Sequence, residues 1–216
     1  MKTEISDIFD LLDKWRLLPA YQLERRADIF FAFYLKQILE AQQLDQSVLK
    51  IIPEFPIKID IVDSNNADNR SFKTDYLVIT DKDILLIELK TDNRSLTKKQ
   101  VKILQKTSET SIYQLIDGII RINKATKSKV KYQRLMEEIE SIGWLKKEAN
   151  QWINLAPRQN PKVLFIKPRP SKKEASNIKD PIYFDEIAAI IEKNDTELSR
   201  RFAKSLRKWK KDPNKK

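Results

Sequence analysis

Two acids and a lysine, Asp75, Glu88 and Lys90, are the residues of this sequence whose types and spacing best suit hydrolytic chemistry. Carboxylate oxygens are the ligands that Mg²⁺ and Mn²⁺ prefer. An ammonium group beside such a metal can orient or help to deprotonate a water molecule, or stabilise charge on a phosphate. The trio therefore predicts a Mg²⁺ or Mn²⁺ site that acts on phosphate esters.

The spacing of the trio depends on a predicted hairpin. Apolar runs at 76–79 and 84–89 are separated by four polar residues and predict two antiparallel strands. A loop of two or four residues places Asp75 directly opposite Glu88, with Cβ atoms about 5 Å apart. Lys90 follows Glu88 by two residues and so points to the same face. A cation between the acids would relieve their repulsion. The alternative is that they are solvated strand ends and that Lys90 pairs with Glu88.

The composition excludes most other catalytic chemistry. The 216 residues include no His and no Cys, which removes imidazole bases, thiol nucleophiles, disulfides and ordinary zinc sites. With two glycines in the whole sequence, a glycine-rich phosphate loop is excluded as well. Hydrophobic residues make up 41%, enough for a folded core.

The charge balance favours a polyanionic partner. There are 42 Lys and Arg against 31 Asp and Glu, a net charge of +11, and nucleic acid is the simplest partner for that excess. No apolar run approaches the roughly 20 residues of a membrane span, and the N-terminus lacks a signal-peptide core. We therefore expect a cytoplasmic protein with no membrane contact.

Helical and extended patterns alternate along the chain. The predicted helices are 6–15, 19–43, 112–122, 132–147, 185–193 and 196–210, and the predicted strands are 55–62, 76–79, 84–89 and 163–166. This order predicts an α/β protein of the α+β type. Its sheet is a three-stranded antiparallel meander that a further strand joins after a helical crossover. We expect one domain over 1–210, with its core at 21–168, and a disordered basic tail at 211–216.

The motif and its context resemble the PD-(D/E)XK nuclease superfamily, the restriction-endonuclease-like fold with an αβββαβ core. The family motif maps onto Asp75, Glu88, Leu89 and Lys90, with Thr74 where a proline is usual. The resemblance implies that Asp75, Glu88 and the main-chain carbonyl of Leu89 bind the metal. It also implies that Lys90 positions or activates the water.

The resemblance adds two further candidates. Glu24 lies seven residues before Phe31, close to the apolar stripe of its helix, and corresponds to the acid that members often carry on the first core helix. Gln114 resembles the glutamine of exonuclease-like members. The alternatives are an acid favoured by the helix macrodipole for Glu24 and a helix-surface polar residue for Gln114.

Basic clusters are candidates for contact with nucleic acid. The residues are Lys98, Lys99 and Lys102 after the hairpin, Arg200, Arg201 and Lys204 in the last helix, and Lys127, Lys129 and Lys131 between them. For each cluster the alternative is a solvated face. The sequence predicts a metal-dependent phosphodiesterase acting on DNA. A non-catalytic nucleic-acid-binding or partner-binding protein that retains the fold is the alternative.

Overall fold

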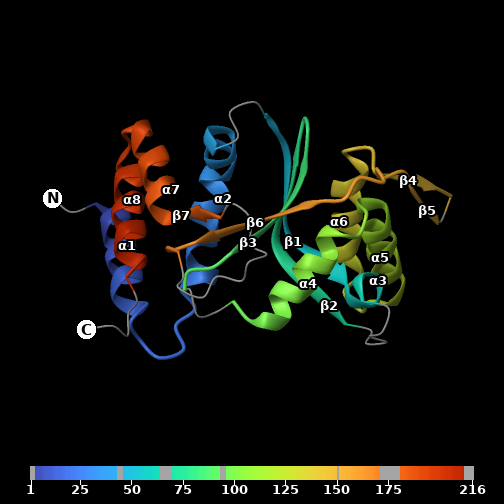
Figure 1. Cartoon of the computed structure of the whole chain (residues 1–216), viewed down its shortest axis with the longest axis horizontal. Coiled ribbons are helices and arrows are strands. Elements are labelled where there is room, and N and C mark those ends of the chain that lie inside the picture. Colours follow the sequence, from blue (N-terminus) through green and yellow to red (C-terminus); the bar gives the residue numbers. More distant parts are fainter. Residues whose placement is uncertain are drawn as a thin grey trace. The chain divides into compact units, whose positions relative to one another are not determined.

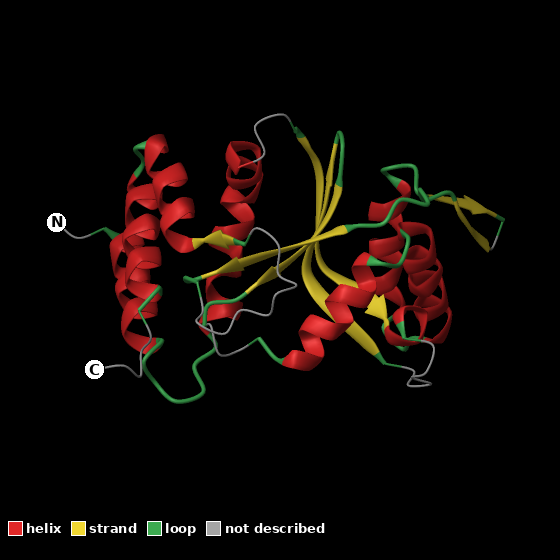
Figure 2. Cartoon of the chain, in the orientation of Figure 1, coloured by secondary structure: helices red, strands yellow, loops and turns green. Residues whose placement is uncertain are grey.

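The computed structural model describes residues 3–42, 46–63, 70–92, 96–149, 151–170 and 181–211. Most of the predicted tail therefore lies outside the described residues. The helices are α1 (Glu4–Trp15), α2 (Leu23–Gln42), α3 (Ile59–Val62), α4 (Lys98–Ser108), α5 (Ile112–Ala125), α6 (Lys129–Glu140), α7 (Phe184–Ile191), η1 (Glu192–Asn194) and α8 (Glu197–Trp209). The strands are β1 (Val48–Lys58), β2 (Ser71–Thr80), β3 (Ile84–Leu89), β4 (Leu145–Glu148), β5 (Gln151–Asn154), β6 (Lys162–Lys167) and β7 (Ile182–Tyr183) (Figures 1 and 2).

The described part of the chain is a mixed α+β structure with eight α-helices. Five strands form one sheet in the order β1-β2-β3-β6-β7, and β4 pairs with β5 in a second sheet. The larger sheet is mixed, because β2 and β3 are antiparallel whereas β6 and β7 are parallel. The predicted α+β class, helices together with a sheet, is confirmed.

No helix within the described ranges has the length and apolar character that a membrane crossing requires.

The predicted hairpin register is confirmed along the paired strands. Tyr76 lies opposite Ile87, and the pairing continues to Ile79 and Ile84. At the turn, the Thr80 N–H donates to the Asp83 carbonyl over 2.9 Å, and the Thr80 hydroxyl accepts from the Asp83 N–H over 2.7 Å. These bonds from Thr80 close a two-residue loop that lacks the glycine or asparagine of the favoured turns.

The described residues form two compact units, each built from segments that are distant in the sequence. Unit 1 comprises Met1–Val48, Glu88–Thr97 and Leu164–Lys216. Unit 2 comprises Leu49–Ile87 and Lys98–Val163. The sequence patterns, which predict one domain over 1–210, do not indicate this division.

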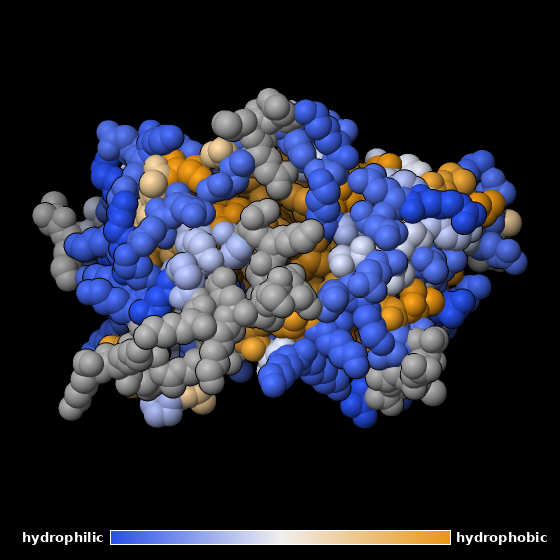
Figure 3. Space-filling view, viewed as in Figure 1, coloured by the Kyte–Doolittle hydropathy of each residue, from blue (hydrophilic) through white to orange (hydrophobic). Residues whose placement is uncertain are grey.

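Unit 1 contains a helical cluster of α1, α2, α7 and α8 with an aromatic core. Phe202 of α8 lies 5.8 Å from Phe9 of α1 and 5.2 Å from Phe31 of α2, measured between ring centroids. Arg200, Lys204, Arg207 and Lys208 of α8 are exposed, and Figure 3 shows a mostly hydrophilic surface over this helix, whereas Ser199, Arg201 and Ser205 are buried. Thr196 caps the helix, since its hydroxyl accepts from the Ser199 N–H.

An acid of α1 joins this helix to α8. Asp13 accepts hydrogen bonds from Lys208 over 2.6 Å and from the Trp209 indole over 2.8 Å. The Arg201 guanidinium lies 3.3 Å from the same carboxylate. Burial raises the pKa of Asp13, but hydrogen bonds from Lys208, Ser205 and Trp209 outweigh that effect and hold it below its usual range.

Unit 2 is organised around the apolar face of α5. Ile112, Leu115, Ile116 and Ile119 are buried in one core with residues of β1, β2 and β3. Gly118 lets α5 approach the end of β1, since a Cβ there would lie 3.1 Å from the Lys58 Cβ and 3.2 Å from Ile61 Cγ1.

The strand predicted over 55–62 is wrong at both ends. β1 begins at Val48 and ends at Lys58, and residues 59–62 form the single turn α3. The Asp63 N–H donates to the Ile59 carbonyl over 2.8 Å, so the backbone is helical there. Ile59 and Val62 are both buried, and their i, i+3 spacing was hidden by the alternation of Ile59 with Ile61.

Three further predictions need correction. The helix predicted over 132–147 ends at Glu140, because Gly143 takes the left-handed conformation at φ +78° and Trp144 donates back to Ile139. The chain then forms the β4–β5 hairpin. Helix α1 is capped by Thr3, whose hydroxyl accepts from the Ser6 N–H. The two-residue strand β7 was not predicted.

Replacing Asp13 tests the junction of α1 and α8. We expect Asp13→Asn to lower the free energy of unfolding at pH 7 by about 2 to 4 kcal/mol, since it breaks a largely buried ion pair. The lowered pKa makes the contribution of Asp13 fully present above about pH 4, the unfolded value, and it disappears as the pH falls through the folded value. The difference between parent and variant should therefore narrow below pH 4, as measured by urea unfolding.

Asp195→Asn is the matched control, because Asp195 is exposed and pairs with Arg200 at the surface. It should cost less than about 1 kcal/mol. A difference between parent and Asp13→Asn that stays constant from pH 7 to pH 3 would contradict the role given to the Asp13 charge.

Candidate active site

The end of β3 carries a buried ion pair. The Lys90 ammonium lies 2.9 Å from Oε1 of Glu88, and the two side chains are only 7% and 3% exposed. They share a face because they are two residues apart at the end of an extended strand. A buried charge costs several kcal/mol unless an opposite charge compensates it, so each group fixes the position of the other.

Glu24 of α2 is the second carboxylate at Lys90. Its Oε1 lies 3.2 Å from the Lys90 ammonium, and its Oε2 accepts from the Thr91 N–H over 3.4 Å. Glu24 also lies in the first turn of α2, where the helix macrodipole favours an acid. Both interpretations of Glu24 from the sequence are therefore compatible with its position. The macrodipole alone does not explain why Glu24 lies beside Lys90.

The backbone around Lys90 is held by a neighbouring strand. The Lys90 N–H donates to the carbonyl of Ile166, in β6, over 2.8 Å. Leu89, between the two charged residues, is 1% exposed and anchors the end of β3 in apolar surroundings. The role predicted for the Leu89 carbonyl as a metal ligand stays a prediction.

A cavity of about 400 Å³ adjoins Glu24 and Thr91 in unit 1. Its lining is polar and charged: Arg16, Tyr21, Gln22, Leu23, Glu24, Arg25, Thr91 and Asp92. Guanidinium groups suit bidentate binding of phosphate oxygens, so Arg16 and Arg25 are candidate ligands for an anionic substrate. Sequence reasoning missed both arginines. The one local signal was their position before and within the first turn of the helix that carries Glu24.

Asp75 lies in unit 2, near the start of the paired part of β2. It is half-buried and stands between Thr74 and Tyr76, which are both buried. The Thr74 hydroxyl donates to the Ile87 carbonyl over 2.7 Å, so the strand is anchored where the family motif usually has proline. Because Asp75 and Glu88 belong to different units, their predicted opposition stays a prediction.

Gln114 has a structural task in unit 2. Its backbone N–H donates to the Ser111 hydroxyl, and its side-chain oxygen accepts from the Ser111 N–H over 3.1 Å. This capping box begins α5 and is the ordinary role of a polar residue at that position. The catalytic role that the resemblance implies for Gln114 has no support from these contacts.

The residues predicted to contact nucleic acid differ in how far their side chains are exposed to solvent. Lys98, Lys99 and Lys102 are exposed on α4, and Lys204 is exposed on α8. Arg200 is exposed and pairs with Asp195. The prediction for Arg201 is wrong, because its side chain is buried against Asp10 and Asp13 and is only 9% exposed. A guanidinium committed to two carboxylates inside a helical cluster cannot reach a phosphate.

The donor set fits a magnesium ion. Among the described residues, no group of three or more acids is gathered in the manner of a complete metal cage. Mg²⁺ does not need one, since one or two carboxylates with waters and substrate phosphates usually hold it. Glu88 and Glu24 carry two negative charges against the single positive charge of Lys90. That surplus of negative charge suits a further cation.

Comparison with protein-family models, with curated proteins and with solved structures found no match for this chain. The resemblance to the PD-(D/E)XK nucleases thus rests on the segment Asp75–Lys90 and on the order of the elements.

Removing the partners of the buried pair one at a time tests their coupling. We expect Lys90→Met to lower the free energy of unfolding by about 3 to 5 kcal/mol, because the Glu88 carboxylate stays buried after the ammonium is lost. The double variant Lys90→Met/Glu88→Gln should be more stable than Lys90→Met alone, since the buried Glu88 charge is then removed and the remaining acid, Glu24, is 31% exposed. Urea unfolding followed by circular dichroism measures both.

Lys146→Met is the control, as Lys146 pairs with Glu148 at an exposed site and should contribute less than about 1 kcal/mol. Losses that simply add in the double variant would show that Glu88 and Lys90 are not coupled.

Proposed function

We propose that this chain is a metal-dependent nuclease that hydrolyses phosphodiester bonds of DNA. The observation that carries the proposal is the Lys90 ammonium, buried between the carboxylates of Glu88 and Glu24. A lysine surrounded by acids at the end of a central strand is expensive to bury and suits phosphate chemistry, in which both a cation site and a positioned ammonium are useful.

The order of the strands supports a restriction-endonuclease-like core. Helix α2 precedes β1, β2 and β3, and helices α4 to α6 separate β3 from β6 along the chain. In the sheet, β6 follows β3 in the order β1-β2-β3-β6. This is the order of elements that the αβββαβ core requires. β7, β4–β5 and the helices α1, α7 and α8 would be additions to it.

The proposed roles follow from the chemistry of each group. Asp75, Glu88 and the carbonyl of Leu89 would hold Mg²⁺ or Mn²⁺, with Glu24 as a further ligand or water holder. When bound, the metal supplies Lewis acidity toward the phosphate and a water of lowered pKa. The ion pairs with Glu88 and Glu24 fix the Lys90 ammonium, so it can orient the attacking water with little reorganisation.

Arg16 and Arg25 give the adjoining cavity a role in the same proposal. Each guanidinium has five N–H donors in a planar fork that matches phosphate oxygens. In this cavity they would bind a phosphate next to the scissile bond, which places the substrate beside Glu24. The cavity thus adds a binding contribution that the motif alone does not include.

A non-catalytic protein with the same fold is the second candidate. The observation that favours it is that Lys90 and its two carboxylates neutralise one another in part without any metal. Such a cluster can serve stability alone, and the chain would then bind nucleic acid or a protein partner without cutting. Metal-dependent cleavage distinguishes the two candidates.

Cleavage of plasmid and linear DNA in Mg²⁺ or Mn²⁺ tests the proposal, with metal binding measured by calorimetry. We expect Asp75→Ala and Glu88→Ala to lose both metal binding and cleavage, because they remove anionic ligands. Lys90→Ala should lose most cleavage but keep most metal binding, since an ammonium does not ligate the metal. Removing a nearby positive charge would even favour the cation slightly.

Glu148→Gln serves as the control, because it removes one exposed carboxylate from the β4–β5 hairpin. It should cut as the parent does. If purified Lys90→Ala and Glu88→Ala cut as fast as the parent, the assigned site is wrong. DNA binding with no cleavage in either metal would favour the non-catalytic candidate.

A further inference from the structure

The end of α5 and the start of α6 carry a run of basic residues that no acid interrupts. Residues 121–136 hold six basic residues and no Asp or Glu. We define the α5–α6 basic surface by the exposed basic residues of this run whose side chains make neither an ion pair nor a hydrogen bond within the described residues: Arg121, Lys124, Lys127, Lys131 and Arg134. All of them belong to unit 2.

Most cations in α8 and directly after it form ion pairs with acids of unit 1. Arg201 and Lys208 bind Asp13, Arg207 pairs with Glu192, and Lys210 lies 2.7 Å from Asp185. Their positive charge is largely compensated within unit 1. The α5–α6 basic surface has no such compensation, so it contributes more to the field that an external polyanion would meet.

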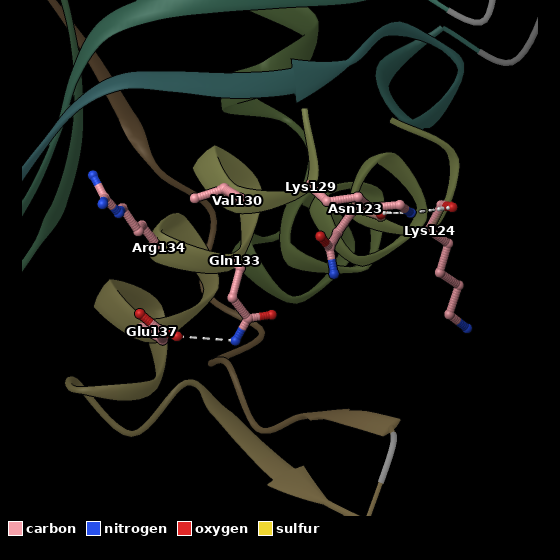
Figure 4. A pocket seen from close by; sticks show the side chains of 7 residues that line it. All are labelled: Asn123, Lys124, Lys129, Val130, Gln133, Arg134 and Glu137. Atoms are coloured by element: carbon pink, nitrogen blue, oxygen red, sulfur yellow. Dashed lines mark hydrogen bonds between the residues drawn. The ribbon is translucent and has the colours of Figure 1, made fainter. Parts of the chain in front are cut away.

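A hollow lies within this surface. A cavity of about 710 Å³ is lined by Asn123, Lys124, Lys129, Val130, Gln133, Arg134 and Glu137. Figure 4 shows Lys124 and Arg134 extending to opposite sides of it, whereas Lys129 turns back toward the end of α5. There the Lys129 ammonium donates to the carbonyls of Asn123 and Lys124, over 2.7 Å each. Lys129 therefore holds the two helix ends together, and its neighbours are available to a ligand.

The arrangement is unfavourable for the protein by itself. Lys129 and Lys131 lie in the first turn of α6, which holds no acid, although the helix macrodipole favours acids there. The N-cap residue Ser128 makes no side-chain capping bond. An anion bound here would relieve the repulsion between the lysines and compensate the positive end of α6.

We propose that the α5–α6 basic surface binds the phosphate backbone of a nucleic acid. The inference deepens the proposed function and rests on it for the choice of nucleic acid among polyanions. A membrane surface is less suitable, because helices that lie on lipid need a broad apolar face. Here Val130, 68% exposed, is the large apolar residue that lines the cavity, while Met136 and Ile139 of α6 are buried in the core.

Binding to a fluorescent 30-base-pair duplex in EDTA tests the proposal without any dependence on cleavage. The surface variant is Lys124→Gln/Lys127→Gln/Arg134→Gln, which leaves Lys129 in place. We expect binding about tenfold or more weaker at 0.1 M salt, and a slope of log K against log salt reduced by about 2 to 3, since each lost phosphate contact removes about 0.9.

The matched control is Lys14→Gln/Lys36→Gln/Lys193→Gln, which removes three exposed cations of unit 1 and the same net charge. Its slope should change by less than about 1. The charge-preserving variant Lys124→Arg/Lys127→Arg/Arg134→Lys should bind as the parent does. Melting temperatures near that of the parent would show that each variant is folded.

Three outcomes would overturn the proposal. One is a surface variant that binds DNA with the affinity and salt slope of the parent. Another is an equal loss in the control, which would mean that only net charge matters. The third is loss of binding to phosphatidylserine–phosphatidylcholine vesicles with DNA binding unchanged, which would assign the surface to lipid. If the parent binds DNA through this surface but cuts it in no metal, the surface stands and the nuclease proposal fails.

Discussion

The buried ammonium of Lys90 is the constraint on which the geometry of the candidate site depends. A lone cation in this position would be several kcal/mol too costly, so the fold must bring acids to it. One acid comes from the same strand and the other from the first turn of α2. Because the Lys90 N–H also binds Ile166, the same few residues align β3, β6 and the start of α2. The requirement to neutralise one charge thereby orders three elements of unit 1.

The junction of α1 and α8 in unit 1 has the opposite arrangement, in which an acid is surrounded by hydrogen-bond donors. There Asp13 is surrounded by the donors of Arg201, Lys208 and Trp209, and Arg201 also binds Asp10. The two clusters explain why a net charge of +11 is a poor guide to where a polyanion binds. Much of the positive charge of α8 is paired with acids of unit 1. The α5–α6 basic surface, which makes no ion pair within the described residues, lies in a segment with fewer basic residues than the last helix.

Sequence patterns predicted the features that depend on residues close together in the chain. The alternation of apolar residues and the polar loop fixed the β2–β3 register, and the spacing of Glu24 from Phe31 placed that acid near the stripe of its helix. The burial of Arg201 was beyond such patterns, because its partner Asp13 lies 188 residues away. The short elements α3, β4, β5 and β7 give too few residues for a period to show. Arg16 and Arg25 join the site only through a cavity, which has no signature in the sequence.

The division of unit 1 among the two ends of the chain has a consequence for biosynthesis. Helices α1 and α2 are synthesised before the other described elements, yet Phe9 and Phe31 pack against Phe202 of α8. All segments of unit 2 are synthesised before α7 and α8 appear, so its core can form while the aromatic faces of α1 and α2 are still uncovered. Contacts between such distant segments form slowly, and exposed aromatic surface favours aggregation. The nascent chain is therefore most in need of a chaperone late in translation, just before α8 is complete.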